Sequence, residues 1–326
     1  MHTDISSERV LAMLSTALGS FAGNLLLDPE VIEVMLNEDG KLWVDRLDAG
    51  LKFSGRELRP EDAERVIFIV ASSIKTVCNQ ERPLLSAELP GIKARFQGVL
   101  PPLSQSPIFS IRKKAIKIFT LSDYTRSNIM CRNHAERILR AVQKRENVVV
   151  VGGTGSGKTT LINALLAEVA KTNDRLLIIE DTPELQCSAQ NVVRLYSKEG
   201  VADMTQLLRA SLRLRPDRIV IGELRGPEAL TFLKACNTGH PGSCVTIHAD
   251  SARKALSRME QLVLEAGFSN SKQLIGEAID LIVFIERTSY GRRVSEVLEV
   301  DIDDDGDYIF RLIPPVPGQP PVEDVD

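Results

Sequence analysis

Long hydrophobic runs are missing from this chain of 326 residues. No stretch approaches the roughly 18–20 consecutive apolar residues that a membrane-spanning helix needs. The N-terminal segment MHTDISSERV also lacks the basic start and the apolar core of a secretory signal. These two absences predict a cytoplasmic protein with no membrane span of its own.

Cysteine is scarce, and a net positive charge is absent. The five cysteines are scattered without a CxxC pair, which argues against a disulfide framework and against a four-cysteine zinc site. The formal net charge of −4 is unlike that of a protein whose main task is to grip a phosphate backbone, so we expect no stable nucleic-acid binding. The remaining composition, 43% hydrophobic and 26% charged, is that of a soluble globular protein long enough for two domains.

Residues 1–118 are predicted to form a small N-terminal α+β domain. Apolar residues at helical spacing alternate here with short strand-like runs, and the acidic residues after Pro60 favour the first turn of a helix. The predicted helices are Ser7–Phe21 and Pro60–Cys78, and the predicted strands are Val31–Leu36, Leu42–Asp45, Gly91–Val99 and Ile108–Ile111.

The rest of the chain has the pattern of an α/β domain. A predicted linker at 119–132 leads into a helix at Asn133–Arg145 and a domain that spans 133–313. Nearly continuous apolar runs suit strands that are buried on both faces of a mainly parallel sheet. These runs are Val148–Val151, Leu176–Ile179, Ile219–Ile221, Cys244–Ile247 and Leu281–Ile285. We expect an antiparallel hairpin at the sheet edge, formed by Val294–Val300 and Tyr308–Ile313. The Pro-rich tail, 314–326, is expected to be disordered.

The strongest motif is a phosphate-binding loop. Residues 152–160 read GGTGSGKTT, which fits the P-loop pattern G-x-x-x-x-G-K-[ST] at every position. The glycines let backbone N–H groups curl around phosphate oxygens, and the following helix adds its positive N-terminal dipole. We expect Lys158 to bridge the β- and γ-phosphates of ATP, and the Thr159 hydroxyl to bind Mg²⁺. The predicted nucleotide-binding residues are Gly152, Gly153, Thr154, Gly155, Ser156, Gly157, Lys158, Thr159 and Thr160.

Two of the apolar runs lead into acidic residues. A P-loop enzyme needs carboxylates at the ends of neighbouring strands, where they hold Mg²⁺ through water and polarise the attacking water. The run at 219–221 leads to Glu223, which fits the Walker B role, and the run at 176–179 leads to Glu180 and Asp181. The sequence alone does not say which of Glu180 and Glu223 activates the water.

Histidines and arginines gather in the same region. His240 and His248 flank the run Cys244–Ile247, where a histidine can donate a hydrogen bond to a γ-phosphate or can serve as a structural hydrogen-bonding group. Zinc binding lacks a Cys or His partner at suitable spacing. Several arginines could reach a γ-phosphate across a domain or subunit boundary. They are Arg209, Arg213, Arg215, Arg218 and Arg225, with Arg112 in the first domain.

Together these motifs resemble the ATPases of type II secretion, type IV secretion and pilus motors. That family carries a Walker A loop, an Asp box, a Walker B segment with a glutamate, and a His box. In this sequence they look like Gly152–Thr160, Ile179–Glu184, Ile219–Glu223 and Thr238–His248. The run Leu212–Gly226 is similar to the type IV branch, and the absence of a four-cysteine module also favours the conjugative, type IV branch.

The resemblance implies a RecA-like P-loop ATPase domain preceded by a smaller N-terminal domain. It also implies a homohexamer at the cytoplasmic face of a bacterial inner membrane, associated with secretion or conjugation components there. The nucleotide would lie between the two domains, with Arg112 contacting it and with Lys158, Glu180, Glu223, His240 and His248 as catalytic residues. Two other interpretations remain open, a RecA-like nucleic-acid translocase and an assembly switch that binds ATP with little turnover.

Overall fold

The computed structural model divides the chain into two compact units, 1–117 and 118–326, called here the first and the second domain. None of the helices within the described residues is long and apolar enough to cross a membrane. The residues that the structure describes are 5–28, 30–46, 50–89, 94–113, 118–269, 271–288 and 291–315.

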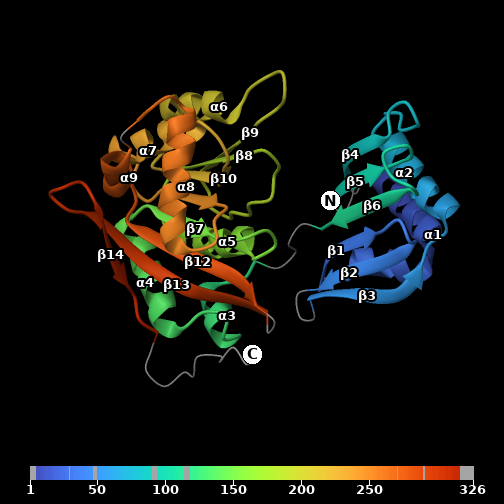
Figure 1. Ribbon diagram of the computed structural model, residues 1–326, viewed down its shortest axis with the longest axis horizontal. Helices are drawn as coiled ribbons and strands as arrows, with labels where there is room; N and C mark the ends of the chain where they lie inside the picture. Colours follow the sequence, from blue (N-terminus) through green and yellow to red (C-terminus); the bar gives the residue numbers. More distant parts are fainter. Residues whose placement is uncertain are drawn as a thin grey trace. The chain divides into compact units, whose positions relative to one another are not determined.

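The first domain is built on an antiparallel sheet (Figure 1). Its described strands run in the order β3-β2-β1-β6-β5-β4. They are β1 (Val31–Leu36), β2 (Lys41–Arg46), β3 (Gly50–Glu57), β4 (Leu84–Leu89), β5 (Ala94–Val99) and β6 (Ile108–Arg112). The sequence predicted β1, β2 and β6 to within one residue, but it missed β3 and β4. In β3 most side chains are exposed, so this edge strand lacks the apolar alternation that reveals a half-buried strand.

Two helices cover one face of this sheet, α1 (Ile5–Leu27) and α2 (Pro60–Ser73). α1 is longer than the predicted helix and is interrupted at Gly19, whose φ of 77° favours glycine. α2 begins at Pro60 as predicted but ends five residues before Cys78. Apolar side chains of both helices and of the strands share one buried core.

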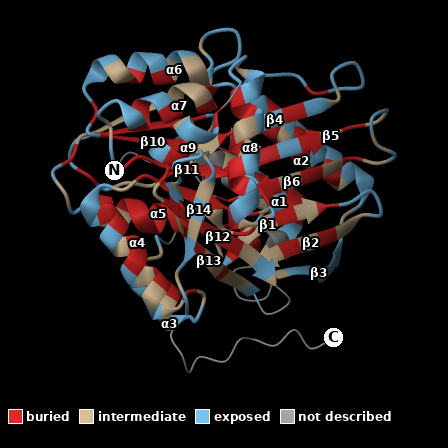
Figure 2. Cartoon of the chain, turned by 60° about the vertical axis from the view of Figure 1, so that its left-hand side comes forward, coloured by how far each residue is buried: buried red, intermediate tan, exposed pale blue. Residues whose placement is uncertain are grey.

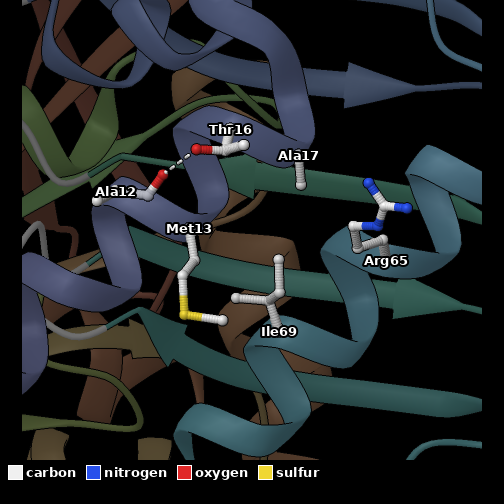
Figure 3. Close-up of a pocket in the computed structure, with 6 residues that line it drawn as sticks. All are labelled: Ala12, Met13, Thr16, Ala17, Arg65 and Ile69. Carbon is white, nitrogen blue, oxygen red and sulfur yellow. Dashed lines mark hydrogen bonds between the residues drawn. The ribbon is translucent and has the colours of Figure 1, made fainter.

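An open hollow lies between α1 and α2 (Figure 3). It is mostly apolar, and the Thr16 hydroxyl that faces it donates to the carbonyl oxygen of Ala12 at 2.9 Å. Among the described residues, Arg65 is the one charged residue that lines it. The hollow therefore lacks the converging polar groups of a nucleotide site. Its lining residues are Ala12, Met13, Thr16, Ala17, Arg65 and Ile69.

The second domain is built on a mainly parallel sheet, in the described order β14-β13-β12-β7-β11-β10-β8-β9. Strands from β12 through β9 in this order are parallel to their neighbours, and the hairpin β13-β14 is antiparallel at one edge. The strands are β7 (Val148–Val151), β8 (Leu176–Glu180), β9 (Val192–Tyr196), β10 (Arg218–Leu224), β11 (Cys244–Ile247), β12 (Leu281–Thr288), β13 (Gly291–Ile302) and β14 (Tyr308–Leu312). The predicted strands and edge hairpin are confirmed, whereas β9 was not predicted.

Helices cover both faces of this second sheet. α3, α4 and α5 pack on one face, and α6, α7, α8 and α9 pack on the other. Figure 2 shows the central strands as buried, and every residue of β7 and β11 is buried. The helices are α3 (Leu121–Arg126), α4 (Arg132–Lys144), α5 (Lys158–Val169), α6 (Met204–Ser211), α7 (Glu228–Asn237), α8 (Ala252–Glu265) and α9 (Lys272–Ala278), with a 3₁₀ turn at Leu212–Leu214.

The segment predicted as a linker, 119–132, is structured. Thr120 caps α3 in a reciprocal capping box with Asp123, and Leu121, Tyr124 and Met130 are buried in the core of the second domain. The short helix was missed because six residues carry little helical periodicity. Of the tail predicted to be disordered, residues 316–326 lie outside the described part of the chain.

Candidate functional site at the carboxyl edge of the second sheet

The candidate site lies at one edge of the second sheet. Because β7, β11, β10 and β8 are parallel neighbours, their carboxyl ends meet at the same edge. The P-loop follows β7, and Glu180 is the last residue of β8. Glu223 is the penultimate residue of β10, and His248 directly follows β11. The sheet topology therefore gathers residues that are almost 100 positions apart in the sequence.

The P-loop connects β7 to α5 and depends on glycine at two positions. Gly157 directly precedes α5 with a φ of 104°, a conformation that side chains other than hydrogen disfavour. At Gly152, an added Cβ would collide with the carbonyl oxygen of Ile285 and with the Ser156 hydroxyl. Among the described residues no side chain caps the start of α5, so its first turn presents backbone N–H groups of the kind that bind phosphate.

Lys158 lies across the curled loop. Its Nζ donates to the carbonyl oxygens of Gly152 at 2.7 Å and Gly153 at 2.9 Å. A second cation comes from β13, where Arg292 Nη2 donates to the carbonyl oxygen of Gly155 at 3.3 Å. Two positive charges therefore border the loop, as an anionic ligand requires. No motif in the sequence singles out Arg292, because its approach to the loop depends on how the edge hairpin packs.

Glu180 is almost completely buried, with 2% of its surface exposed. Its Oε1 accepts hydrogen bonds from the backbone N–H groups of Glu184, at 2.9 Å, and Leu185, at 2.7 Å. Burial raises the pKa of Glu180, and the two backbone hydrogen bonds oppose that rise. The carboxylate predicted to be catalytic is therefore engaged with the loop that follows its own strand.

Glu223 is half-buried and is bound to an arginine. Arg225 donates to Glu223 Oε2 from Nη2 at 2.6 Å and from Nε at 3.0 Å, and it reaches Asp181 Oδ2 at 3.3 Å. Asp181 also accepts from the Ser197 hydroxyl at 2.5 Å. Arg225 thus links the predicted Walker B and Asp box carboxylates in one network.

Glu184 is a site residue that the sequence analysis did not single out. Its Oε2 lies 3.4 Å from the Thr159 hydroxyl. A hydroxyl and a carboxylate are the hard oxygen donors that Mg²⁺ prefers, and Mg²⁺ is commonly held by one or two such groups plus substrate phosphates. The donor set beside the P-loop therefore fits Mg²⁺. The only signal in the sequence was the place of Glu184 at the end of the Asp-box segment Ile179–Glu184.

The two histidines lie at opposite edges of the sheet. His248 is exposed at the carboxyl end of β11, the P-loop edge. His240 comes before the start of β11, its Nδ1 lies 3.2 Å from the carbonyl oxygen of Ala235, and its carbonyl oxygen accepts from the Ser243 hydroxyl. One chain therefore does not bring His240 to its own P-loop, because β11 is parallel to β7 and its two ends point to different edges.

The candidate arginines also differ in their burial and in their partners. Arg218 is buried against Asp174, with Nε to Oδ2 at 2.6 Å, so it is a structural residue and not a free finger. Arg209, Arg213 and Arg215 are exposed. Arg112 is exposed at the end of β6 in the first domain, and its contact with nucleotide stays a prediction.

The sequence matches the protein family described as "Type II/IV secretion system protein" over residues 84–289. The chain belongs to this family. A conjugal transfer protein, TrbB of Rhizobium radiobacter, is 47% identical over 298 residues, which cover 91% of this chain and 92% of the relative. A type IV secretion system protein, VirB11 of Bartonella quintana, is 30% identical over 89% of this chain and 94% of its own length.

Solved structures show the same fold. The Legionella pneumophila ATPase DotB has a TM-score of 0.61 at 17% identity and covers 90% of this chain and 79% of its own. The pilus retraction motor PilT, solved with ADP, has a TM-score of 0.61 at 19% identity, with coverage of 93% and 83%. The predicted fold class, a RecA-like P-loop domain after a smaller α+β domain, is therefore confirmed.

Proposed function

We propose that this protein is an ATP-hydrolysing motor of a conjugative type IV secretion apparatus. One observation carries the proposal above the others: a complete P-loop lies at the same sheet edge as Glu223, Asp181 and His248. The similarity to TrbB over nearly the whole chain supports conjugation as the process that the motor drives. The products would be ADP and phosphate, and the work would be pilus assembly or substrate transfer.

In this proposal each residue at the edge has a defined role. Lys158 stabilises charge on the β- and γ-phosphates, and the Thr159 hydroxyl holds the Mg²⁺ that neutralises the triphosphate. The half-buried Glu223 polarises the attacking water. We favour Glu223 over Glu180 for this role, because Glu180 is only 2% exposed whereas 25% of the Glu223 side chain is exposed. A base needs an oxygen within reach of the water.

Two further roles in the proposal concern histidine and the first domain. His248 would donate a hydrogen bond to the γ-phosphate. A catalytic role for His240 would require a second copy of the chain, since His240 lies at the far edge of its own sheet. Arg112 would contact the nucleotide from the first domain. We propose a homohexamer that associates with conjugation components at the cytoplasmic face of the inner membrane.

The test is steady-state ATP hydrolysis combined with mass measurement by light scattering. We expect a ring-sized assembly whose turnover falls by about 10²–10³-fold or more in Lys158→Ala and Glu223→Gln, since each loses a group that acts on transition-state charge or on the nucleophile. Lys171→Ala and Glu265→Gln are matched controls, because both remove an exposed charge outside the P-loop: Lys171 follows the carboxyl end of α5, and Glu265 ends α8. Both controls should keep wild-type turnover.

Single-stranded DNA separates the proposal from a nucleic-acid translocase. Turnover that is indifferent to DNA supports the secretion motor, as the net charge of −4 suggests. Strong stimulation by DNA would favour the translocase. ATP binding without turnover in the full-sized assembly would contradict the motor and leave a nucleotide-gated switch.

A further inference from the structure

One edge of the second sheet ends at β14 (Figure 1). β14 pairs with β13 in antiparallel register without a bulge. The N–H of Ile313 donates to the carbonyl oxygen of Val297, and hydrogen bonding alternates along such a ladder. The N–H and C=O groups that point away from β13 are therefore those of Tyr308, Phe310 and Leu312. No described residue makes a hydrogen bond to these groups, which are called here the free edge of β14.

The free edge lacks the features that usually prevent a further strand from pairing. Edge strands are commonly protected by proline, lysine, a bulge or a covering element. β14 contains neither proline nor lysine, and its one charged residue, Arg311, pairs with Glu299 at 3.1 Å. Each face of the strand also exposes an apolar side chain, Ile309 at 45% and Leu312 at 55%. An added strand with alternating apolar residues would cover both of them.

β14 is also held firmly in its extended form. The Tyr308 hydroxyl donates to Glu260 on α8 at 2.8 Å, and the guanidinium of Arg253 lies 4.6 Å from the centre of the Phe310 ring. Two side chains of α4 approach the carbonyl oxygens that directly follow β14. A further strand would therefore meet an edge that is already ordered, which lowers the entropic cost of binding.

The turn between β13 and β14 is rich in aspartate. All of the aspartates at this turn are exposed, and Lys272 pairs with one of them, Asp307, at 2.6 Å. The aspartate-rich turn therefore keeps a negative charge beside the start of the free edge, which favours a strand with lysine or arginine at that end. The aspartates are Asp301, Asp303, Asp304, Asp305 and Asp307.

Two other occupants fit this edge less well. The segment 316–326 of this chain carries three prolines, which have no N–H to donate, and it ends in VEDVD, whose three acids the turn would repel. β14 of a second copy contains no lysine, and its Arg311 is already engaged with Glu299. Charge therefore favours a basic segment from a different protein.

We propose that the free edge of β14 binds an extended, basic segment of another protein, which adds a strand to the second sheet beside the aspartate-rich turn. The backbone of the segment pairs with the outward groups of β14, and its alternating apolar side chains cover Ile309 and Leu312. Backbone pairing supplies the affinity, and the side chains and charges supply the selectivity. The inference goes beyond the proposed function, because no nucleotide contact takes part in it.

The test is hydrogen exchange of the full-length protein with synthetic peptides at millimolar concentration. The basic probe alternates threonine and valine and ends in three lysines, and the acidic probe ends in three glutamates instead. A third probe is the basic one with two adjacent central residues N-methylated, which blocks a donor on each edge of the peptide. The basic probe should slow exchange at Tyr308–Leu312 in a saturable manner, and less so at high salt. The other two probes should not.

A substitution at position 312 tests the backbone pairing from the side of the protein. Leu312→Pro removes an outward N–H and leaves the ladder with β13 intact, a position where edge strands tolerate proline. The affinity for the basic probe should fall by at least about fivefold, while ATP turnover stays at the wild-type value. Leu312→Val keeps the N–H and an apolar side chain, so this matched control should bind the probe as wild type does.

The charge preference has its own variant. Asp304→Asn combined with Asp305→Asn should weaken binding of the basic probe and reduce the salt dependence. Unchanged binding in this variant would contradict the role of the aspartate-rich turn. If Leu312→Pro does not fold, the N-methylated probe decides, since binding as tight as that of the plain basic probe would contradict strand addition.

Three further outcomes would overturn the inference. The first is the absence of protection by the basic probe, and the second is protection outside β13 and β14. The third is a self-association, seen by light scattering without any probe, that Leu312→Pro abolishes, because a second copy would then occupy the edge. None of these outcomes bears on ATP hydrolysis, so the proposed function is tested separately by Lys158→Ala and Glu223→Gln.

Discussion

The two sheets of this protein bury their side chains in different ways. The antiparallel sheet of the first domain has helices on one face, and most side chains of its edge strand β3 are exposed. The parallel sheet of the second domain has helices on both faces, and β7 and β11 are buried throughout. Polar groups of the second sheet therefore gather at strand ends.

This difference explains where the candidate site lies. Parallel strands bring their carboxyl ends to one edge, whereas antiparallel neighbours alternate their ends. In the second domain, that edge collects the P-loop and the carboxylates of the Asp box and Walker B segments. The same burial encloses the Arg218–Asp174 ion pair in the second domain, whereas the ion pairs among the described residues of the first domain stay partly exposed. Substitutions that probe buried against exposed contacts should therefore affect the two domains unequally.

The largest effect is expected for Arg218→Ala in the second domain. Arg218 donates to Asp174 at 2.6 Å and to the carbonyl oxygen of Val142 at 3.0 Å, with 2% of its side chain exposed. Its removal leaves the buried Asp174 carboxylate paired with Arg145 alone among the described ion pairs. The free energy of unfolding should fall by about 3 kcal/mol, the lower end of the cost of breaking a buried pair. Hydrogen exchange at increasing urea, read from peptides of each domain, measures the change.

Arg46→Ala is the matched substitution in the first domain. Arg46 pairs with Asp28 at 2.7 Å, and about a third of each side chain is exposed, 33% and 30%. Water screens this pair, so its loss should cost about 1 kcal/mol or less. Equal costs for Arg46→Ala and Arg218→Ala would contradict the contrast between the two sheets.

Substitution of alanine for a tightly packed glycine should have a smaller effect on stability than Arg218→Ala. Gly152→Ala meets a backbone carbonyl, which cannot rotate away, and should destabilise the second domain by about 1–3 kcal/mol while abolishing nucleotide binding. Gly98→Ala in the first domain meets the side chains of Phe96 at 2.8 Å and Ile67 at 3.1 Å, which is less close than the approach of the added Cβ at Gly152 to the backbone carbonyl, so its cost should be lower. Gly153→Ala has open space and is the control that should fold as wild type.

A small pH dependence is expected for the second domain, which contains the buried His134. His134 is buried on α4, and burial lowers its pKa although its ring nitrogen lies 2.9 Å from the carbonyl oxygen of Ile313. A histidine that binds its proton more weakly when folded makes the fold less stable as pH falls below about 6.5, by at most about 1.4 kcal/mol per pH unit.

Urea unfolding at pH 7.5 and 5.5 measures this dependence, with His134→Gln as the comparison. The variant should lose part of the drop in the second-domain midpoint. The first domain contains no histidine among its described residues, so its midpoint serves as the internal reference. A drop of the same size in wild type and variant would show that His134 is not its source.

Strands could be predicted from the sequence best where burial on both faces of the sheet requires apolar residues. Strands buried on both faces are visible as apolar runs, so β7, β8, β10, β11 and β12 were found. The strands β3, β4 and β9 were missed because exposed or partly exposed strands carry weaker patterns. The domain boundary at 117–118 differs from the expected linker because α3 joins the core through Leu121 and Tyr124.

The same distinction holds for the candidate site. The P-loop could be predicted because its glycines, Lys158 and Thr159 act within one short segment. Glu184 could not be ranked above Glu180 or Asp181 from the sequence, because all three are carboxylates within one short segment. Their different environments follow from the hydrogen bonds that they make in the fold. The sequence places His240 before the strand and His248 at its end, but only the parallel pairing of β11 with β7 shows which of these two ends lies at the P-loop edge.

The sequence by itself determined that a phosphate-binding loop joins a buried strand to a helix, since local residues alone produce that loop. It also determined the family, through four boxes that keep their order along the chain. Only the tertiary structure decided which carboxylates and histidines meet the loop, because those distances depend on strand order, on parallel register and on buried hydrogen bonds between residues far apart in the chain. The geometry of a short motif depends on residues that are neighbours in the sequence, whereas the geometry of a site at a sheet edge depends on the whole fold.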